Sequence, residues 1–371
     1  MRAYALLRAG FPYVKTLGMR RITSNPVDIA IGEERRLYVL CRGDLATEIR
    51  RTNWDDEDLG TIGGLGRADG KFVWPAALIL DRDENLLVSD EALHRISSFN
   101  RDGKFLGAWG EFGAGEGQLN RPSGIAFDRD ENVYVADTLN HRIQKFTKRG
   151  RFLLTWGRPG AGDGEFNMPW GIGVDDEGDV YVADWRNDRI QKFSPEGQFM
   201  LSFGCPRRSD HGAAAATHDP ASVSFPAWLE RGPSLNAGTS DSPARGELCR
   251  PSGVAVDRDG DIYVADWGNN RIQIFDPEGR YVQQFLGDAT LSRVGREYLL
   301  ANAHPLRLRE MADLEPQKRF KSPVSVRVDA DGHMYVPDYG CHRIQIYQKE
   351  ADRLGPDGIV PPLRSPTLTT A

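Results

Sequence analysis

The sequence predicts an all-β fold, a six-bladed β-propeller, because a long segment is repeated, the repeat has a blade-like period, and each copy contains strand-like runs. The segment that begins at Arg121 returns almost unchanged from Met168 and from Arg250, with weaker copies around these three. Each copy starts at a proline, and the six are Pro26, Pro75, Pro122, Pro169, Pro251 and Pro323. Their spacings are 49, 47, 47, 82 and 72 residues, and a period near 47 is typical of propeller blades.

Each copy is predicted to form four strands. In the third copy the expected strands are Gly124 to Asp128, Val133 to Ala136, Arg142 to Phe146 and Phe152 to Trp156. These runs are rich in Val, Ile, Tyr and Phe, and Gly, Asp, Asn and Pro separate them. A single four-stranded blade cannot bury both of its faces, so the blades are expected to pack against one another around an axis.

The N-terminal segment is predicted to close the ring. The sixth copy shows three strands, the last ending near Tyr347, whereas Tyr13 to Gly18 resembles the fourth-strand segment Phe152 to Gly157. Pairing this segment with the last blade would leave no open sheet edge. Tyr4 to Leu7 also resembles a strand, but the sequence does not place it. We therefore expect one propeller domain over residues 1–349 and a loose, proline-rich tail over residues 350–371.

This pattern resembles the NHL-repeat family of six-bladed propellers, over roughly residues 11 to 349 apart from two insertions. The resemblance implies the fold more strongly than an activity, since propellers support unrelated functions. Some members of the family bind RNA through a basic face, and Arg20, Arg21, Arg35 and Arg36 could form such a patch. A net charge of −6 and a pI near 5.7 argue against nucleic acid or an anionic membrane as the main partner.

Composition favours a cytoplasmic protein. The sequence contains no apolar run long enough to cross a membrane, and the N-terminal Met1 to Arg8 breaks too early for a signal peptide. Four cysteines in 371 residues do not suggest a secreted disulfide scaffold. Cys205 and Cys249 bracket the first insertion and could be joined, but a reducing compartment would keep them as thiols.

Two insertions interrupt the repeat on either side of the fifth copy. Subtracting 47 from 82 and 72 leaves about 35 and 25 extra residues, in segments 205–249 and 288–321. Both lie in connections between blades, which share one face of a propeller with the turns between second and third strands. We therefore expect them to form a lid on that face, with helices at Ser292 to Asn302 and Leu306 to Leu314.

Several polar residues recur with the repeat and are therefore expected to hold the fold. An Asp and an Arg five residues apart flank the turn between strands two and three in five copies: Asp90/Arg95, Asp137/Arg142, Asp184/Arg189, Asp266/Arg271 and Asp338/Arg343. His94, His141 and His342 share the position before this Arg. Asp-rich segments such as Asp329-x-Asp331 resemble calcium loops but fit hairpin turns better.

Residues that differ between copies at the channel opening are the candidates for ligand binding. The residue after the repeated Asp is Arg42, Glu91, Thr138, Trp185, Trp267 or Tyr339 in blades 1 to 6, and Trp170 adds a further ring in blade 4. Trp170, Trp185, Trp267 and Glu91 are predicted to contact a ligand. An aromatic wall with one cation suits a small molecule that has a planar or apolar body and a carboxylate. Alternatively, the aromatic rings only pack beneath the connecting loops.

One branch of the NHL-like propellers, the peptidylglycine-amidating lyases, sharpens the catalytic alternative. These enzymes use an arginine in a first-blade Arg-Gly-Asp segment, which Arg42-Gly43-Asp44 matches. Tyr339 lies close to the position of their catalytic tyrosine, in a loop one residue shorter. Their zinc ligands are histidines directly after the anchoring prolines, where this chain has Val27, Ala76, Ser123, Trp170, Ser252 and Val324. The zinc site is therefore missing, and no metal ligand is assigned.

Three hypotheses about function remain open. The leading one is a protein that binds a small organic or peptide-like anionic ligand in the lidded opening. The second is a lyase or hydrolase at the same place, in which Arg42 stabilises developing negative charge and Tyr339 acts as a general acid or base. The third is a platform for a protein partner on the lid face. The sequence identifies no cofactor, and His211, His218 and His304 in the insertions could bind a metal.

Overall fold

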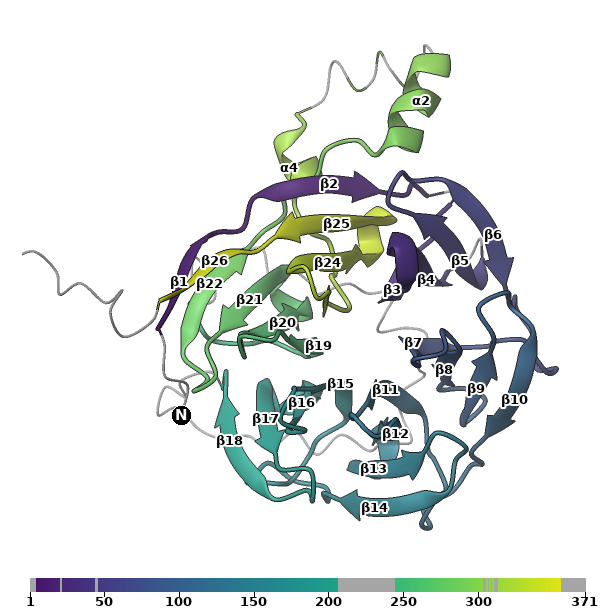
Figure 1. Cartoon of the computed structure of the whole chain (residues 1–371), viewed down its shortest axis with the longest axis vertical. Coiled ribbons are helices and arrows are strands. Elements are labelled where there is room, and N and C mark those ends of the chain that lie inside the picture. The colour runs from purple at the N-terminus through teal and green to yellow at the C-terminus, as the bar shows by residue number, and fades with distance from the viewer. Residues whose placement is uncertain are drawn as a thin grey trace, which may run out of the picture.

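Six antiparallel four-stranded sheets surround a central channel, which confirms the six-bladed β-propeller (Figure 1). The computed structural model describes residues 5–20, 22–43, 46–205, 244–302, 305, 307, 309 and 313–354. In each blade the first strand lines the channel and the fourth lies at the perimeter, as Figure 1 shows for β11 and β14.

The strands follow the repeat closely. Blade 1 consists of β3 (Pro26–Ile31), β4 (Arg36–Arg42), β5 (Thr47–Asn53) and β6 (Asp58–Ile62). Blade 2 consists of β7 (Pro75–Leu80), β8 (Leu86–Asp90), β9 (Arg95–Phe99) and β10 (Phe105–Trp109). Blade 3 consists of β11 (Pro122–Phe127), β12 (Asn132–Asp137), β13 (Arg142–Thr147) and β14 (Phe152–Trp156). Blades 4 and 5 consist of β15 (Pro169–Val174), β16 (Val180–Asp184), β17 (Arg189–Phe193) and β18 (Phe199–Phe203); β19 (Pro251–Val256), β20 (Ile262–Asp266), β21 (Arg271–Phe275) and β22 (Tyr281–Phe285). Blade 6 contains β23 (Arg327–Val328), β24 (His333–Asp338), β25 (Arg343–Gln348) and β2 (Tyr13–Leu17).

The hydrophobic core lies between neighbouring blades. In β12 the residues from Val133 to Asp137 are all buried, whereas the outer strand β14 is only partly covered. Tyr134 and Ile143 of blade 3 pack in one cluster with Val182 and Phe193 of blade 4. The apolar face of each blade is therefore buried by the next blade, which explains why one copy could not fold alone.

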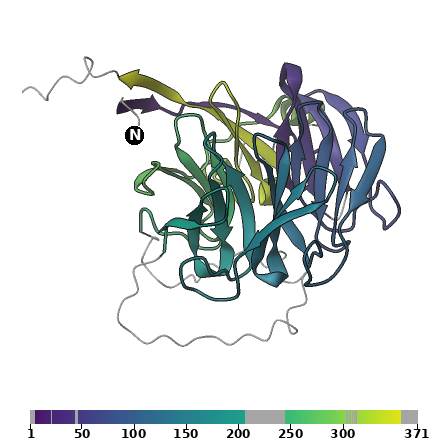
Figure 2. The same cartoon turned by 60° about the horizontal axis from the view of Figure 1, so that its bottom comes forward.

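The N-terminal strand closes the ring as predicted. β2 pairs antiparallel with β25, so that Tyr13 lies opposite Tyr347 and Leu17 opposite Ile344. The segment that the sequence could not place forms β1 (Ala5–Gly10), which pairs with β26 (Glu350–Leu354) in a two-stranded ribbon beyond the ring (Figure 2). The start of the expected loose tail is thus a strand, and residues 355–371 lie outside the described residues.

The residue before the repeated Arg links successive blades. His141 adopts a left-handed conformation with φ of 53°, and its Nδ1 accepts a hydrogen bond from the Met168 N–H at 3.2 Å. His94 and His342 accept in the same way from the N–H groups of Arg121 and Asn25. In blades 4 and 5 the equivalent residues Asp188 and Asn270 provide the acceptor. The prediction that these histidines hold the fold is confirmed.

The Asp–Arg pairs connect strands two and three in four of the five blades that carry them. The Arg Nε donates to the Asp carboxylate at 2.7–2.9 Å in the pairs Asp137/Arg142, Asp184/Arg189, Asp266/Arg271 and Asp338/Arg343. Blade 2 differs from the prediction, because Arg95 donates to the carbonyl groups of Ala68 and Lys71. There, Asp90 instead accepts from the N–H groups of Val73 and Trp74.

Replacing Arg271 with alanine is expected to lower the free energy of unfolding by about 3–5 kcal/mol, because the buried Asp266 carboxylate loses its ionic partner. The matched control is Arg280→Ala in the same blade. Arg280 is 73% exposed and pairs with Asp276 and Glu278 in solvent, so its removal should change stability little. Urea unfolding followed by tryptophan fluorescence measures both effects, and equal losses would contradict the structural role of the buried pair.

The insertions differ from the expected lid as far as they are described. The first falls largely in residues 206–243, outside the described residues. The second contains α2 (Arg293–Ala301), which matches the predicted helix, and α4 (Glu315–Lys318), whereas most of the other predicted helix, 306–314, is not described. α2 projects from the perimeter of the ring beside β2 (Figure 1).

Contacts with the turn between β5 and β6 explain the position of α2. Arg293 donates to the Asp55 and Asp56 carbonyl groups, and the Asp56 carboxylate accepts from the N–H groups of Gly18 and Val294. Ser292 donates to the Gly18 carbonyl at 2.7 Å and caps the helix by accepting from the Gly295 N–H. These bonds hold α2 outside the ring rather than over the channel. In the described part of the chain, no helix has the length and apolar character needed to cross a membrane.

Candidate ligand site at the channel opening

The candidate site residues lie at the end of the channel where the first strands begin. In blade 2, Pro75 at the start of β7 lies opposite Asp90 at the end of β8, and Pro122 lies opposite Asp137 in blade 3. The residue after each anchoring proline and the residue after each repeated Asp therefore share this end, here called the channel opening. In four blades a one-turn 3-10 helix follows the Asp: η2 (Thr138–Asn140), η3 (Trp185–Asn187), η5 (Trp267–Asn269) and η6 (Tyr339–Cys341).

The three tryptophans predicted to contact a ligand come together at this opening. The ring centroids of Trp170 and Trp185 are 6.2 Å apart, and those of Trp185 and Trp267 are 6.5 Å apart. Their exposed fractions are only 2–5%, and they share one hydrophobic cluster with Met168. Tyr339 packs against the same cluster from blade 6. The rings therefore form a packed aromatic layer across this end of the channel.

Arg42 and Glu91 form a buried pair on the other side of the opening. Arg42 Nη1 donates to Glu91 Oε1 at 3.4 Å and to the Pro75 carbonyl at 3.1 Å, and both side chains are about 2% exposed. The guanidinium also stacks on Trp74, with Cζ 4.6 Å from the ring centroid. The sequence placed Arg42 and Glu91 at this opening but did not identify Trp74, which lies in a variable connection just before Pro75.

Several polar atoms of this group are buried without a hydrogen-bond partner among the described residues. They are Nε and Nη2 of Arg42, Oε2 of Glu91 and Nε1 of Trp74. Leaving a buried donor or acceptor unpaired costs about 1–3 kcal/mol. The Nε and Nη2 atoms form one edge of the guanidinium, and this edge can hold a carboxylate through two parallel hydrogen bonds.

Burial raises the pKa of Glu91 from its ordinary value to about 8, although the nearby Arg42 acts in the opposite direction. Glu91 is therefore mostly a neutral carboxyl at pH 7, so it has no negative charge to balance the charge of Arg42. The opening thus combines a buried guanidinium that keeps its positive charge with an acid that titrates just above neutral pH. Such a pair favours an anion at lower pH and loses that preference as Glu91 ionises.

The catalytic pair suggested by the lyase resemblance is only partly described. Asp44 of the Arg42-Gly43-Asp44 segment lies outside the described residues, and the described hydrogen bonds of Arg42 include two to blade 2. The Tyr339 carbonyl accepts from Asn25 Nδ2 at 3.3 Å. Two of the residues directly after the anchoring prolines serve here in contacts between blades. Ser123 donates to the Trp170 carbonyl and Ser252 to the Val324 carbonyl.

Two cavities lie inside the channel, beyond the aromatic layer. The first holds about 30 Å³ beside Trp170, and the second, about 300 Å³, is lined by the last residues of the first strands. Asp28 lines the narrow part and Arg327 both parts, and the two form an ion pair with Arg327 Nε 3.0 Å from Asp28 Oδ1. Neither residue was predicted from the sequence, although each replaces a small or apolar residue of the repeat.

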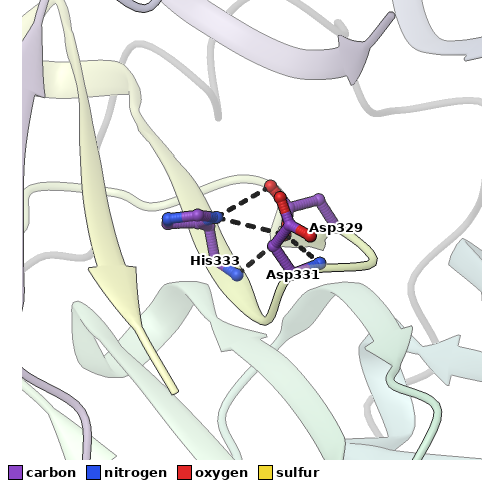
Figure 3. Close-up of side chains that lie close together, drawn as sticks. All are labelled: Asp329, Asp331 and His333. Atoms are coloured by element: carbon purple, nitrogen blue, oxygen red, sulfur yellow. Dashed lines mark hydrogen bonds and ion pairs between the residues drawn. The ribbon is translucent and has the colours of Figure 1, made fainter. Parts of the chain in front are cut away.

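A possible metal-binding group lies in the turn between β23 and β24. Ligand atoms of Asp329, Asp331 and His333 all lie within 4.8 Å of one another (Figure 3). The Asp329 carboxylate accepts from the N–H groups of Asp331 and His333, each at 2.9 Å, and from His333 Nδ1 at 3.0 Å. These bonds build the hairpin turn, so the prediction that the Asp-rich segments are turns is confirmed.

The equivalent turns of other blades bind lysines. Lys349 Nζ lies 2.5–3.0 Å from carboxylate oxygens of Asp257, Asp259 and Asp261, and Lys192 Nζ lies 2.7 Å from Asp179. The acidic turns are thus cation sites filled by the chain itself. Of the other suggested ligands, His211, His218 and His304 lie outside the described residues. Cys205 and Cys249 are free, and burial raises the pKa of the Cys249 thiol to about 11.

Comparison with known proteins identifies the repeat. Residues 119–146, 166–193 and 248–275 match the model of the NHL repeat. Protein lin-41 of Caenorhabditis elegans is 48% identical over 54 residues, which are 15% of this chain and 5% of lin-41. The E3 ubiquitin-protein ligase TRIM71 of Mus musculus is 53% identical over 49 residues, 13% of this chain and 6% of that protein. The matches thus span about a twentieth of these curated relatives.

Solved structures share the architecture over nearly the whole chain. A catalytically inactive virginiamycin B lyase from Staphylococcus aureus, crystallised with quinupristin, superposes with a TM-score of 0.52 and 13% identity, covering 95% of this chain and 88% of the lyase. A Bacteroides thetaiotaomicron protein of unknown function gives a TM-score of 0.55 at 16% identity, covering 94% and 76%. At these identities the likeness establishes the propeller fold alone.

Proposed function

We propose that this chain, an NHL-repeat protein folded as a six-bladed β-propeller, binds a small organic or peptide-like carboxylate at the channel opening. The observation that carries the proposal is the unpaired Nε and Nη2 edge of the buried Arg42, beside a carboxyl that is mostly neutral at pH 7. The ligand carboxylate would accept from both nitrogens. Its planar or apolar body would rest on Trp74 and on the aromatic layer that contains Trp170, Trp185 and Trp267.

The cost of leaving part of a buried guanidinium unpaired favours an occupant of this site. A buried guanidinium is costly unless its hydrogen-bonding capacity is met, and Arg42 satisfies only Nη1 within the described residues. A carboxylate that pairs the free edge would remove that penalty in a region of low dielectric, where each charged hydrogen bond is strong. The equivalent positions in blades 3 to 6 carry Thr138, Trp185, Trp267 and Tyr339, so the repeat itself does not require a charge here.

A lyase or hydrolase acting at the same opening is the second candidate. The observation that favours it is the Glu91 pKa of about 8, because a general acid or base works best when its pKa lies near the working pH. In that case Arg42 would stabilise the developing anion, and Glu91 or Tyr339 would transfer the proton. The third possibility, a platform for a protein partner on the face predicted to carry the insertions, remains a prediction.

The binding proposal is tested with N-acetylphenylalanine and its uncharged amide, which differ only in the carboxylate. Titration calorimetry at pH 7 should show at least a tenfold preference for the acid in the wild-type protein, because charge-assisted hydrogen bonds contribute about 1.5–3 kcal/mol. Arg42→Met should abolish this preference. Arg158→Met, at a side chain that is 78% exposed, serves as the matched control and should leave it intact.

Two results would contradict the proposal. Equal affinity of the wild-type protein for the acid and the amide would show that the Arg42 edge does not hold an anion. An Arg42→Met protein that unfolds cooperatively and keeps the preference would place the carboxylate elsewhere. Release of a product from either compound, followed by chromatography and lost in Glu91→Gln, would support the enzymatic candidate instead.

A further inference from the structure

The wider cavity of the channel has the properties of a second, independent binding site. Its volume is about 300 Å³, and it lies at the end of the channel where the first strands finish, away from the aromatic layer. Apart from Arg327, the side chains that line it are apolar and include Ile31, Leu80, Phe127 and Val256, and backbone polar groups of the first strands share the wall with them. Arg327 is the one charged side chain among the residues that line it.

The repeat itself creates this space. The fourth residue after the anchoring proline is small in four blades, namely Ala30, Ala126, Gly173 and Ala255, whereas it is Ile79 in blade 2 and Arg327 in blade 6. At the second residue after the anchoring proline the channel is narrow, because the first strands of adjacent blades approach closely there. A Cβ added at Gly124 would lie 2.3 Å from the Trp170 carbonyl oxygen. The cavity is therefore wide beyond this constriction and narrow toward the channel opening.

Arg327 reaches toward the narrow end of the cavity and is held there by Asp28. Its Nε and Nη2 donate to the two carboxylate oxygens of Asp28, at 3.0 and 2.5 Å, and Nη2 lies 3.5 Å from the Leu78 carbonyl. The Arg327 side chain is 21% exposed, whereas that of Asp28 is 2% exposed. An arginine fixed by two parallel hydrogen bonds presents its remaining edge in a defined direction.

Asp28 and Arg327 differ in how completely their hydrogen-bonding groups are paired. Besides the two bonds from Arg327, the Asp28 carboxylate accepts from the N–H groups of Ile29 and Leu78 and from the Ser325 hydroxyl. The neutral donors already stabilise part of its negative charge. Arg327 Nη1 has no hydrogen-bond partner in the described part of the chain and is not enclosed by protein. The pair thus offers a free donor and no comparable free acceptor.

We propose that this cavity binds a small monocarboxylate with an unbranched apolar body. The carboxylate accepts from Arg327 Nη1, and the body packs against the apolar side chains that line the cavity. The site is separate from the one at the channel opening, because the aromatic layer and the constriction lie between them. Acidic turns occur at this end of the blades, but lysines pair with several of them, such as Lys148 with Asp81 and Lys145 with Asp128. An anion approaching Arg327 therefore does not meet their full negative charge.

The probes are octanoate, octanamide and octylamine, which share one apolar body and differ in the charge of the head group. Calorimetric titration of the full chain should show octanoate binding at least tenfold more tightly than octanamide, and octylamine more weakly still. The double variant Asp28→Asn/Arg327→Met removes both charges of the ion pair and should abolish the preference for octanoate over octanamide. Ala255→Leu narrows the cavity without changing its charge and should weaken octanoate and octanamide by a similar factor.

Arg158→Met, at a side chain that is 78% exposed, is the matched control and should bind octanoate like the wild type. In the Arg42→Met protein, which lacks the carboxylate partner of the other site, the preference for octanoate over octanamide should persist. Equal binding of all three probes, or tighter binding of octylamine, would overturn the proposal. So would an Ala255→Leu protein with unchanged octanoate affinity. If the double variant does not fold, the Ala255→Leu result and the three-probe comparison still decide the matter. Binding of N-acetylphenylalanine unaffected by Ala255→Leu would keep this proposal distinct from the one at the channel opening.

Discussion

Deletion of residues 1–18 is expected to abolish cooperative folding of the propeller, because blade 6 loses its outer strand β2. Leu17 is 1% exposed and Phe11 is 8% exposed, and Phe11 packs edge-on against Phe285 of blade 5. Burial of each such side chain contributes about 1.5–3 kcal/mol, and each backbone hydrogen bond to β25 about 1 kcal/mol. The total exceeds about 5 kcal/mol, which is comparable with the whole stability of a typical domain.

The matched control is deletion of residues 1–10, which removes β1 but keeps β2. This variant loses the ribbon with β26 and the ion pair between Arg8 and Asp261, and we expect a modest decrease in the urea midpoint with unfolding still cooperative. Adding a synthetic peptide of residues 11–20 to the longer deletion should restore near-native tryptophan fluorescence. A cooperative transition at the wild-type midpoint without residues 1–18 would show that the ring does not need this strand.

The strands of the ring could be predicted from the sequence because the same pattern of strands and turns occurs in six copies. In blade 3 the expected strand Phe152 to Trp156 is the strand observed, and the pairing of Tyr13 to Leu17 with the last blade followed from one unfilled strand position. The ribbon of β1 and β26 could not be predicted in this way. Its partners are separated by almost the whole chain, and neither is part of a repeated unit.

The candidate site was predicted in position but not in its contacts. Counting from the repeated Asp placed Arg42, Glu91, Trp185 and Trp267 at one end of the channel, as the structure places them. The direct pairing of Arg42 with Glu91 depends on side-chain conformations across two blades, which the repeat does not encode. The low exposure of the tryptophans depends likewise on packing between blades.

Asp28 and Arg327 could have been found in the same way, by looking for residues that differ between copies of the repeat. Both break the repeat at channel-facing positions, where the other blades carry small or apolar residues. The position of α2 could not be found in this way, since an insertion of this length can fold to either side of its blade. Its contacts with Asp55 and Asp56 in the β5–β6 turn decide that it lies at the perimeter.

Replacing Glu91 with glutamine is expected to remove a pH-dependent loss of stability that the wild-type protein shows between pH 5 and 8.5. Burial raises the pKa of Glu91 in the folded protein to about 8, from an ordinary value of 4.5. A carboxyl whose folded pKa is raised stabilises the protein fully below its unfolded pKa. This stabilisation is lost as the pH rises toward the folded pKa, because only the unfolded chain readily releases the proton.

Glutamine has no proton to release and keeps an oxygen that can accept from Arg42. Between pH 5 and 8.5 the wild type should therefore lose on the order of 4 kcal/mol relative to Glu91→Gln, since one pKa unit corresponds to about 1.36 kcal/mol. Urea unfolding at a series of pH values measures this difference. Glu278→Gln, at an exposed carboxylate, is the matched control and should follow the wild-type pH profile. A wild-type profile parallel to that of Glu91→Gln would show that Glu91 is ionised throughout.

The same titration should govern the ligand if Arg42 holds its carboxylate. Below pH 8 Glu91 is mostly neutral and the charge of Arg42 attracts the anion, whereas above pH 8 the ionised Glu91 competes for the guanidinium. Affinity for N-acetylphenylalanine should therefore fall as the pH rises through about 8, and affinity for its amide should change little. Because glutamine stays neutral, Glu91→Gln should bind the acid with nearly constant affinity across this range. A decrease that persists in Glu91→Gln would assign the titration to another group.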